Sequence, residues 1–125
     1  MTTPWLLLAI ALAGGAGAAL RLVVDGTVRS VARRRPHTAT LVVNVTGSFA
    51  LGLVTGLAAS AGLPHEWLLV LGGGLLGGYT TFGTASVEAV RLLLDGRGAS
   101  GAGHALGTLV LSVAAAALGL LLGGA

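Results

Sequence analysis

Four long apolar stretches, joined by short polar connections, leave this chain few ways to fold. A helix needs about 20 mostly apolar residues to cross about 30 Å of hydrocarbon. Only 9% of the 125 residues are charged, too few to cover the surface of a soluble domain of this size. The sequence therefore predicts one all-α membrane domain, residues 1–125, with four transmembrane helices. The predicted spans cover about residues 4–24, 38–63, 67–94 and 104–123.

The basic residues are all arginines, and they stand at the edges of the apolar stretches. They do not interleave with aromatic residues, so no nucleic-acid partner is expected. With four spans, the first and third loops share one side of the membrane. All seven arginines fall on that side: Arg21, Arg29, Arg33, Arg34, Arg35, Arg91 and Arg97. The positive-inside rule makes it the cytoplasmic side. The Ala-, Gly- and Arg-rich composition suits a bacterium with a GC-rich genome, so we expect a multi-pass protein of the bacterial inner membrane.

The third span is too rich in glycine to form one regular helix. It contains five glycines between Gly72 and Gly78, followed by the polar run Tyr79–Thr84. Glycine disfavours helix, and non-helical backbone inside a membrane must line a cavity or be buried in protein. We therefore predict that this helix is broken near the bilayer centre. Carbonyl groups exposed by such a break can bind a hard cation such as Na⁺.

Small and polar residues repeat every four positions in the second and fourth spans, which places each set on one helix face. The second-span set is Thr40, Asn44, Ser48, Gly52 and Gly56, and the fourth-span set is His104, Thr108, Ser112 and Ala116. One interpretation is close helix–helix packing. The other is a hydrogen-bonding path for a polar solute. The residues alone leave both open.

Three further features have a structural and a functional interpretation. Arg21 either extends to the membrane interface or places positive charge at a water-filled vestibule. Glu88 and Arg91 are three residues apart, so we expect them to pair on one helix face. The histidines show no spacing typical of a transition-metal site. No nucleophile–base pair is visible either, so an enzyme is not expected.

Several of these runs resemble a known family. The run Thr40–Phe49 resembles the second-span signature of the Fluc (CrcB) fluoride channels, and Gly77–Thr84 resembles their third-span break. Gly14–Arg21 is similar to their glycine-rich first span, which ends in Arg. The four-span plan matches as well, so the resemblance covers nearly the whole chain.

The resemblance implies a subunit of a fluoride channel that lowers cytoplasmic fluoride by passive export. Its dimer would consist of two oppositely oriented subunits, with pores at the interface. A structural Na⁺ would be held by the carbonyls of Gly77 and Thr80. The resemblance also implies that seven side chains lie along the fluoride path: Arg21, Thr40, Asn44, Thr81, Phe82, Thr108 and Ser112.

Three positions depart from the family pattern. Gly83 replaces the family Ser, Ala85 replaces a second Phe, and Thr108 stands where the family often has Tyr. Two aromatic anion contacts are therefore missing. A chain that inserts in both orientations also needs little charge bias, whereas every arginine here is on one side. We therefore expect this chain to be one half of a heterodimer, the alternative being a self-sufficient homodimer.

Two other functions remain as alternatives. A small four-span multidrug-type exporter needs a carboxylate deep in the membrane, and Glu88 lies near a helix end. A non-conducting assembly subunit would explain the small-residue faces but not the predicted break in the third span.

Overall fold

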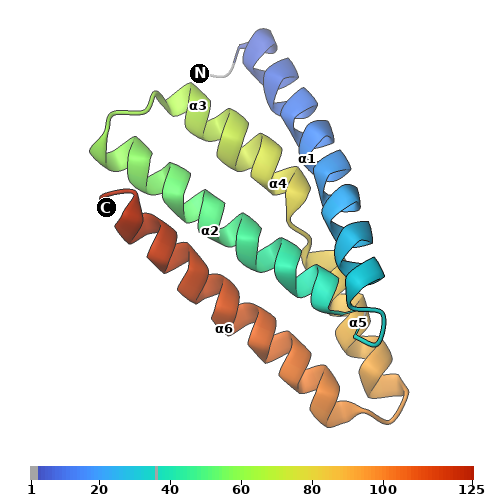
Figure 1. Ribbon diagram of the computed structural model, residues 1–125. Coiled ribbons are helices and arrows are strands. Elements are labelled where there is room, and N and C mark those ends of the chain that lie inside the picture. The colour runs from blue at the N-terminus through green and yellow to red at the C-terminus, as the bar shows by residue number, and fades with distance from the viewer. Residues whose placement is uncertain (1–2, 36) are drawn as a thin grey trace.

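The computed structural model describes residues 3–35 and 37–125, and all regular elements in these residues are helical. Four helical stretches are long and apolar enough to cross a membrane: Pro4–Val31, Thr38–Ser60, His65–Leu94 and Gly98–Leu122. Figure 1 shows them as four elongated arms, with α3, α4 and α5 following one another in the third. The prediction of an all-α, multi-pass membrane protein with four spans is confirmed.

Helix α1 (Pro4–Val31) begins with a capped first turn and continues past the predicted end of its span near Val24. The side chain of Thr3 accepts a hydrogen bond from the Leu6 amide at 3.2 Å. Beyond the apolar part, an ion pair between Arg29 and Asp25 (2.8 Å) supports another helical turn. The helix has 28 residues, or about 42 Å at 1.5 Å per residue, which exceeds the hydrocarbon thickness. Its polar end therefore extends beyond the apolar span.

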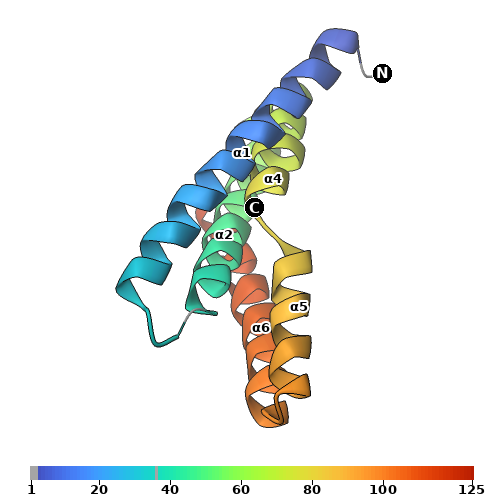
Figure 2. The same ribbon diagram turned by 90° about the vertical axis from the view of Figure 1, so that its right-hand side faces the viewer.

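Helices α2 (Thr38–Ser60) and α6 (Gly98–Leu122) lie side by side and run in the same direction (Figures 1 and 2). A Cβ on Gly56 would lie 2.6 Å from the Leu120 carbonyl oxygen, and one on Gly52 would overlap the Ala116 carbonyl. Both pairs differ by 64 in residue number, which defines the register of the two helices. Their glycines thus allow close backbone approach, as the packing interpretation predicts.

The last loop is shorter than predicted, because helix α6 begins at Gly98 rather than near His104, whereas helix α2 ends at Ser60 rather than near Leu63, which lengthens the second connection. Gly96 has φ +76°, a conformation that glycine adopts without strain, and this permits the tight turn into α6.

The third span consists of four successive segments: α3 (His65–Leu68), the π-helical segment η1 (Leu69–Leu76), α4 (Gly77–Tyr79) and α5 (Phe82–Leu94). Between α4 and α5 the backbone is extended, with φ −77° and ψ 158° at Thr80 and φ −145° and ψ 115° at Thr81. Figure 2 shows α5 separating from α1 after this point. We call Thr80 and Thr81 the interhelical link.

The surface of the chain is apolar over most of its length. Many leucines of the spans are exposed, such as Leu109 at 60% and Leu22 at 69%. The buried apolar side chains are few: Ala39, Val43, Tyr79 and Leu92. A soluble protein would bury large apolar side chains, whereas lipid accepts them. The burial pattern therefore agrees with a membrane protein whose spans face lipid or other subunits.

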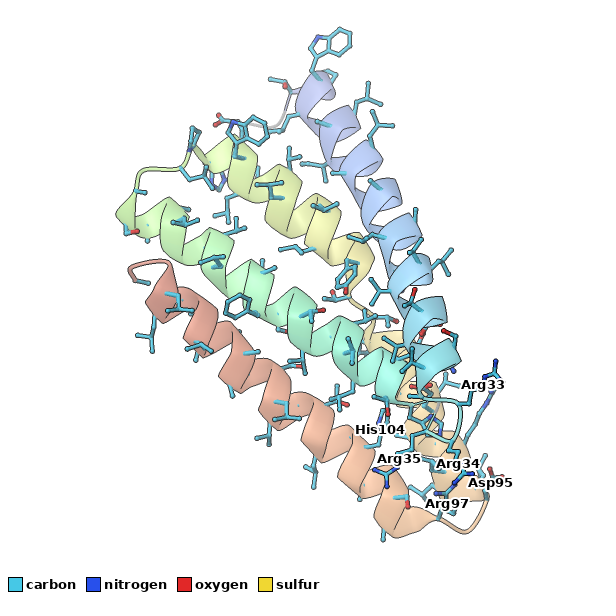
Figure 3. All side chains as sticks on the ribbon, in the orientation of Figure 1. Arg33, Arg34, Arg35, Asp95, Arg97 and His104 are labelled. Carbon is cyan, nitrogen blue, oxygen red and sulfur yellow. The ribbon has the colours of Figure 1, made fainter. Side chains whose placement is uncertain are left out.

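The arginine-rich loops lie together at one end of the molecule. Figure 3 shows Arg33, Arg34 and Arg35 of the first connection close to the turn that carries Asp95 and Arg97. The expectation that the first and third loops share one side is thus met by the fold. That this side faces the cytoplasm stays a prediction from the positive-inside rule.

Candidate functional site

A row of buried hydroxyl groups runs along the contact between α2 and α6. The helix register places Thr40, Asn44 and Ser48 level with His104, Thr108 and Ser112. Thr40 is 1% exposed and Thr108 is 9% exposed. The hydroxyls of Thr40, Thr108 and Ser112 have no hydrogen-bond partner among the described residues. We call these three residues the hydroxyl track.

The two halves of the α2–α6 contact therefore differ in chemistry. In the half near the chain ends, Gly52 and Gly56 contact the backbone of α6 directly. In the arginine-rich half, the hydroxyl track presents buried donors without partners. A buried polar group without a partner costs free energy, so native proteins keep few of them. Packing accounts for the glycines, but it leaves the hydroxyl track unexplained.

Asn44 holds the interhelical link by two hydrogen bonds. Its Nδ2 donates to the Thr81 carbonyl oxygen, and its Oδ1 accepts from the Thr81 amide, both at 2.8 Å. The Asn44 side chain is buried. An amide side chain can satisfy both backbone groups of one residue because it carries a donor and an acceptor. The structure thus gives Asn44 a positioning role, and a place for it along an ion path stays a prediction.

Two neighbours of Asn44 on α2 also position the link. A Cβ on Gly47 would overlap the Thr80 methyl group, so only glycine lets the link approach this closely. The hydroxyls of Thr46 and Tyr79 lie 2.9 Å apart and form a hydrogen bond. This pair was not among the residues predicted from the sequence.

The link also frees the two carbonyl groups that the family resemblance implies as Na⁺ ligands. In a continuous α-helix, the amide of residue i+4 would donate to each carbonyl. The Thr81 amide instead donates to Asn44, and the Thr84 amide donates to the Thr81 hydroxyl at 3.2 Å. The carbonyls of Gly77 and Thr80 thus lose their helical partners. Such carbonyls suit a hard cation, so the residues present fit a Na⁺ site.

The other predicted path residues lie on the surface of this single chain. Phe82 is 87% exposed at the first turn of α5. Arg21 is half-buried on α1, and no carboxylate of the described residues lies within 4 Å of it. Neither residue forms a hydrogen bond or an ion pair with the hydroxyl track among the described residues. Their predicted roles require a second subunit or a bound ion.

Glu88 has other partners than the one predicted from the sequence. The predicted pair with Arg91 is wrong, because the Glu88 carboxylate instead lies 3.4 Å from Arg29, 3.2 Å from His37 and 3.4 Å from His104. Its side chain is only 10% exposed. Arg91 is exposed, whereas the other three groups surround the carboxylate from α1, from the residue before α2 and from α6. We call Glu88, Arg29, His37 and His104 the carboxylate cluster.

The carboxylate cluster lies at the end of the hydroxyl track, because His104 is one helical turn from Thr108. The His37 and His104 rings are 5.4 Å apart, although 67 positions separate them in the sequence. No spacing pattern could reveal such a meeting. The only sign of this cluster in the sequence was a single carboxylate, that of Glu88, within an apolar segment.

The chain is similar to known proteins over most of its length. A family model described as CrcB-like protein, Camphor Resistance (CrcB), matches residues 8–120. The chain belongs to the CrcB family. Its relatives include the fluoride-specific ion channel FluC 1 of Leifsonia xyli, which is 52% identical over 98% of this chain and 89% of its own length. The fluoride-specific ion channel FluC 2 of Cutibacterium acnes is 42% identical over 98% of each chain. These CrcB relatives carry the names of ion channels and not of enzymes.

Proposed function

We propose that this CrcB-family chain is a subunit of a fluoride-selective channel, which lowers cytoplasmic fluoride by passive export across the bacterial inner membrane. Family membership supports the substrate. The hydroxyl track is the structural observation that carries the proposal. Fluoride is a small anion that accepts hydrogen bonds, and a hydroxyl can rotate to donate one. Buried hydroxyls without internal partners can therefore replace part of the hydration shell of the ion.

We propose that the path is completed at a dimer interface with an oppositely oriented subunit, because Phe82, one of the predicted path residues, is 87% exposed on the single chain. Phe82 and the freed carbonyl of Gly77 lie on exposed parts of the chain. The ring edge of an exposed Phe carries partial positive charge and can face an anion once a partner excludes water and lipid. Na⁺, held by the carbonyls of Gly77 and Thr80, would fix the link at this interface. In this arrangement the break of the third span lies near the bilayer centre.

The partner that we propose is a second, different CrcB-family subunit. The arginines of this chain all fall in or beside the first and third connections, which favours one orientation in the membrane. Gly83 and Ala85 also lack the side chains that the family has at these positions. A Cβ on Gly83 would meet no atom within 4 Å, so the missing side chain is not excluded by packing within this chain.

Fluoride efflux from liposomes tests the proposal directly. The purified chain would be reconstituted alone and with the second subunit, and chloride efflux measured in parallel. We expect selective fluoride efflux only when both subunits are present. Fluoride efflux from the chain alone would disprove the heterodimer but would support the channel function. No selective efflux from either sample of folded protein would contradict the channel assignment.

The hydroxyl track gives a prediction of its own. Replacing Thr108 by Val and Ser112 by Ala removes two hydroxyl donors and changes side-chain volume little. A hydrogen bond to a charged group contributes about 1.5–3 kcal/mol, so losing one donor at the barrier should slow fluoride efflux by at least about tenfold. Thr55→Val is the matched control, since the Thr55 hydroxyl donates to its own helix at Leu51. Unchanged efflux in T108V/S112A would place the ion path elsewhere.

A multidrug-type exporter is less consistent with the structure. Its membrane carboxylate would have to exchange protons for a cationic substrate. The one buried carboxylate in the described spans, Glu88, is already surrounded by Arg29 and two histidines. An added cation would have to compete with Arg29 for the Glu88 carboxylate.

A further inference from the structure

The arginine-rich end contains a pocket whose lining includes none of the residues predicted to line the fluoride path. It has a volume of about 530 Å³ and lies between the first connection and the starts of α2 and α6. Arg34, Arg35 and Arg97 line it, together with both histidines of the carboxylate cluster. Figure 3 shows Arg34, Arg35 and Arg97 close together and Arg33 pointing away from them. We call this space the arginine pocket.

The charges of the arginine pocket are not neutralised within the chain. None of its three arginines has a carboxylate within 4 Å among the described residues. Glu88, the nearest buried carboxylate, contacts the two histidines and Arg29. Three guanidinium groups that share one pocket repel one another unless an anion lies between them. Guanidinium groups bind phosphate through paired hydrogen bonds.

Two helix starts add to the same positive potential. Helices α2 and α6 have 23 and 25 residues, and neither has a side-chain N-cap. The N-terminus of a helix carries partial positive charge and free amide groups, which favour anions. Thr38 of α2 and Ser100 of α6 both line the arginine pocket.

His104 connects the arginine pocket to the carboxylate cluster. Its side chain is only 9% exposed and lines the arginine pocket, while its Nε2 lies 3.4 Å from the Glu88 carboxylate.

The rest of the lining favours an amphiphile over a free anion. Leu41 and Leu92 contribute apolar surface to the pocket. Nearby, Leu93 and Leu94 of α5 are 62% and 80% exposed, which suits contact with acyl chains. Basic pockets between membrane helices at the cytoplasmic boundary are suited to anionic lipid headgroups.

We propose that the arginine pocket binds the phosphate of an anionic phospholipid from the adjoining membrane leaflet. The phosphate lies between Arg34, Arg35 and Arg97 and links the first connection to the starts of α2 and α6. Because these elements also carry His37 and His104 of the carboxylate cluster, the lipid braces that end of the hydroxyl track. The proposal does not depend on which ion the chain conducts.

Native mass spectrometry of the full chain in detergent tests this site, with dioleoylphosphatidylglycerol and dioleoylphosphatidylcholine as probes. A micelle of a non-ionic detergent offers no charged surface, so only a specific pocket can distinguish the two lipids. We expect phosphatidylglycerol to bind at least about tenfold more tightly, and Arg35→Gln or Arg97→Gln each to weaken it about fivefold, since one arginine near an anionic headgroup contributes about 1 kcal/mol. Binding of phosphatidylcholine should not change.

Arg33→Gln is the matched control, because it removes the same charge from the same loop outside the arginine pocket. We expect its affinity for phosphatidylglycerol to stay within about twofold of the parent chain, well below the effect of a pocket arginine. An equal loss in R33Q would show that only net charge matters and would overturn the site. Displacement of the lipid by excess inorganic phosphate would identify a free-phosphate site and overturn the proposal of a lipid ligand. Equal binding of both lipids by the parent chain, verified as monodisperse, would also overturn the proposal of an anionic-lipid site.

Discussion

Fluoride efflux should fall at least about tenfold when Asn44 is replaced by Ala, although the dimer should persist. The substitution removes both hydrogen bonds to Thr81 and leaves an amide and a carbonyl unpaired inside the membrane. Side-chain hydrogen bonds within membranes contribute about 0.6–2 kcal/mol each, and 1.4 kcal/mol corresponds to tenfold. The Thr81 amide would also be free to donate to the Gly77 carbonyl, which would straighten the link.

The measurement is efflux from liposomes containing the conducting assembly, together with the dimer fraction from cross-linking. Thr55→Ala serves as the control on the same helix, because its hydroxyl bonds only within α2. Parent-like efflux from N44A would show that the link keeps its form without Asn44. Loss of the dimer along with efflux would instead assign Asn44 to assembly.

A second large effect is expected at Gly17, where replacement by Ala should strongly destabilise the fold. The new Cβ would overlap the backbone carbonyl of Leu75 and crowd the Tyr79 amide at 3.0 Å. Overpacking costs about 1–3 kcal/mol where neighbours can move, and backbone atoms move less readily than side chains, so we expect the upper end of that range or more. Helix α1 would have to separate from η1 and α4.

Denaturation by SDS, followed by circular dichroism, measures this loss. Gly15→Ala is the matched control two positions earlier on the same helix, since its Cβ would meet no atom within 4 Å. Because Ala favours helix over Gly, G15A should be neutral or more stable by up to about 1 kcal/mol. Equal denaturation midpoints for G17A and G15A would contradict the close packing of α1 against the third span.

The sequence predicted much of the fold because hydrophobicity and charge act locally. Four apolar runs of spanning length specify four membrane helices, whatever their neighbours. The arginines report orientation for the same reason. The glycine-rich run predicted irregular backbone in the third span, and the structure has a π-helical segment and an extended link at Thr80 and Thr81. Helix ends were less predictable, since α1 continues to Val31 on an Asp25–Arg29 pair outside its apolar part.

Residue periodicity also identified the two polar helix faces, but it could not say what each face would meet. That depends on the register between two helices whose contacting residues are 64 positions apart, and only packing sets it. The register is what divides the contact into a glycine half and the hydroxyl track.

The sequence by itself thus determined the four spans, their charge asymmetry and the resemblance to the CrcB family, because each depends on local composition or on short motifs. Tertiary structure alone decided which polar groups are free. It placed Asn44 on the backbone of Thr81, and it surrounded Glu88 with Arg29 and two histidines instead of Arg91. The physical reason is that hydrogen bonds and ion pairs act over a few ångströms, so their partners are set by the distances that packing creates.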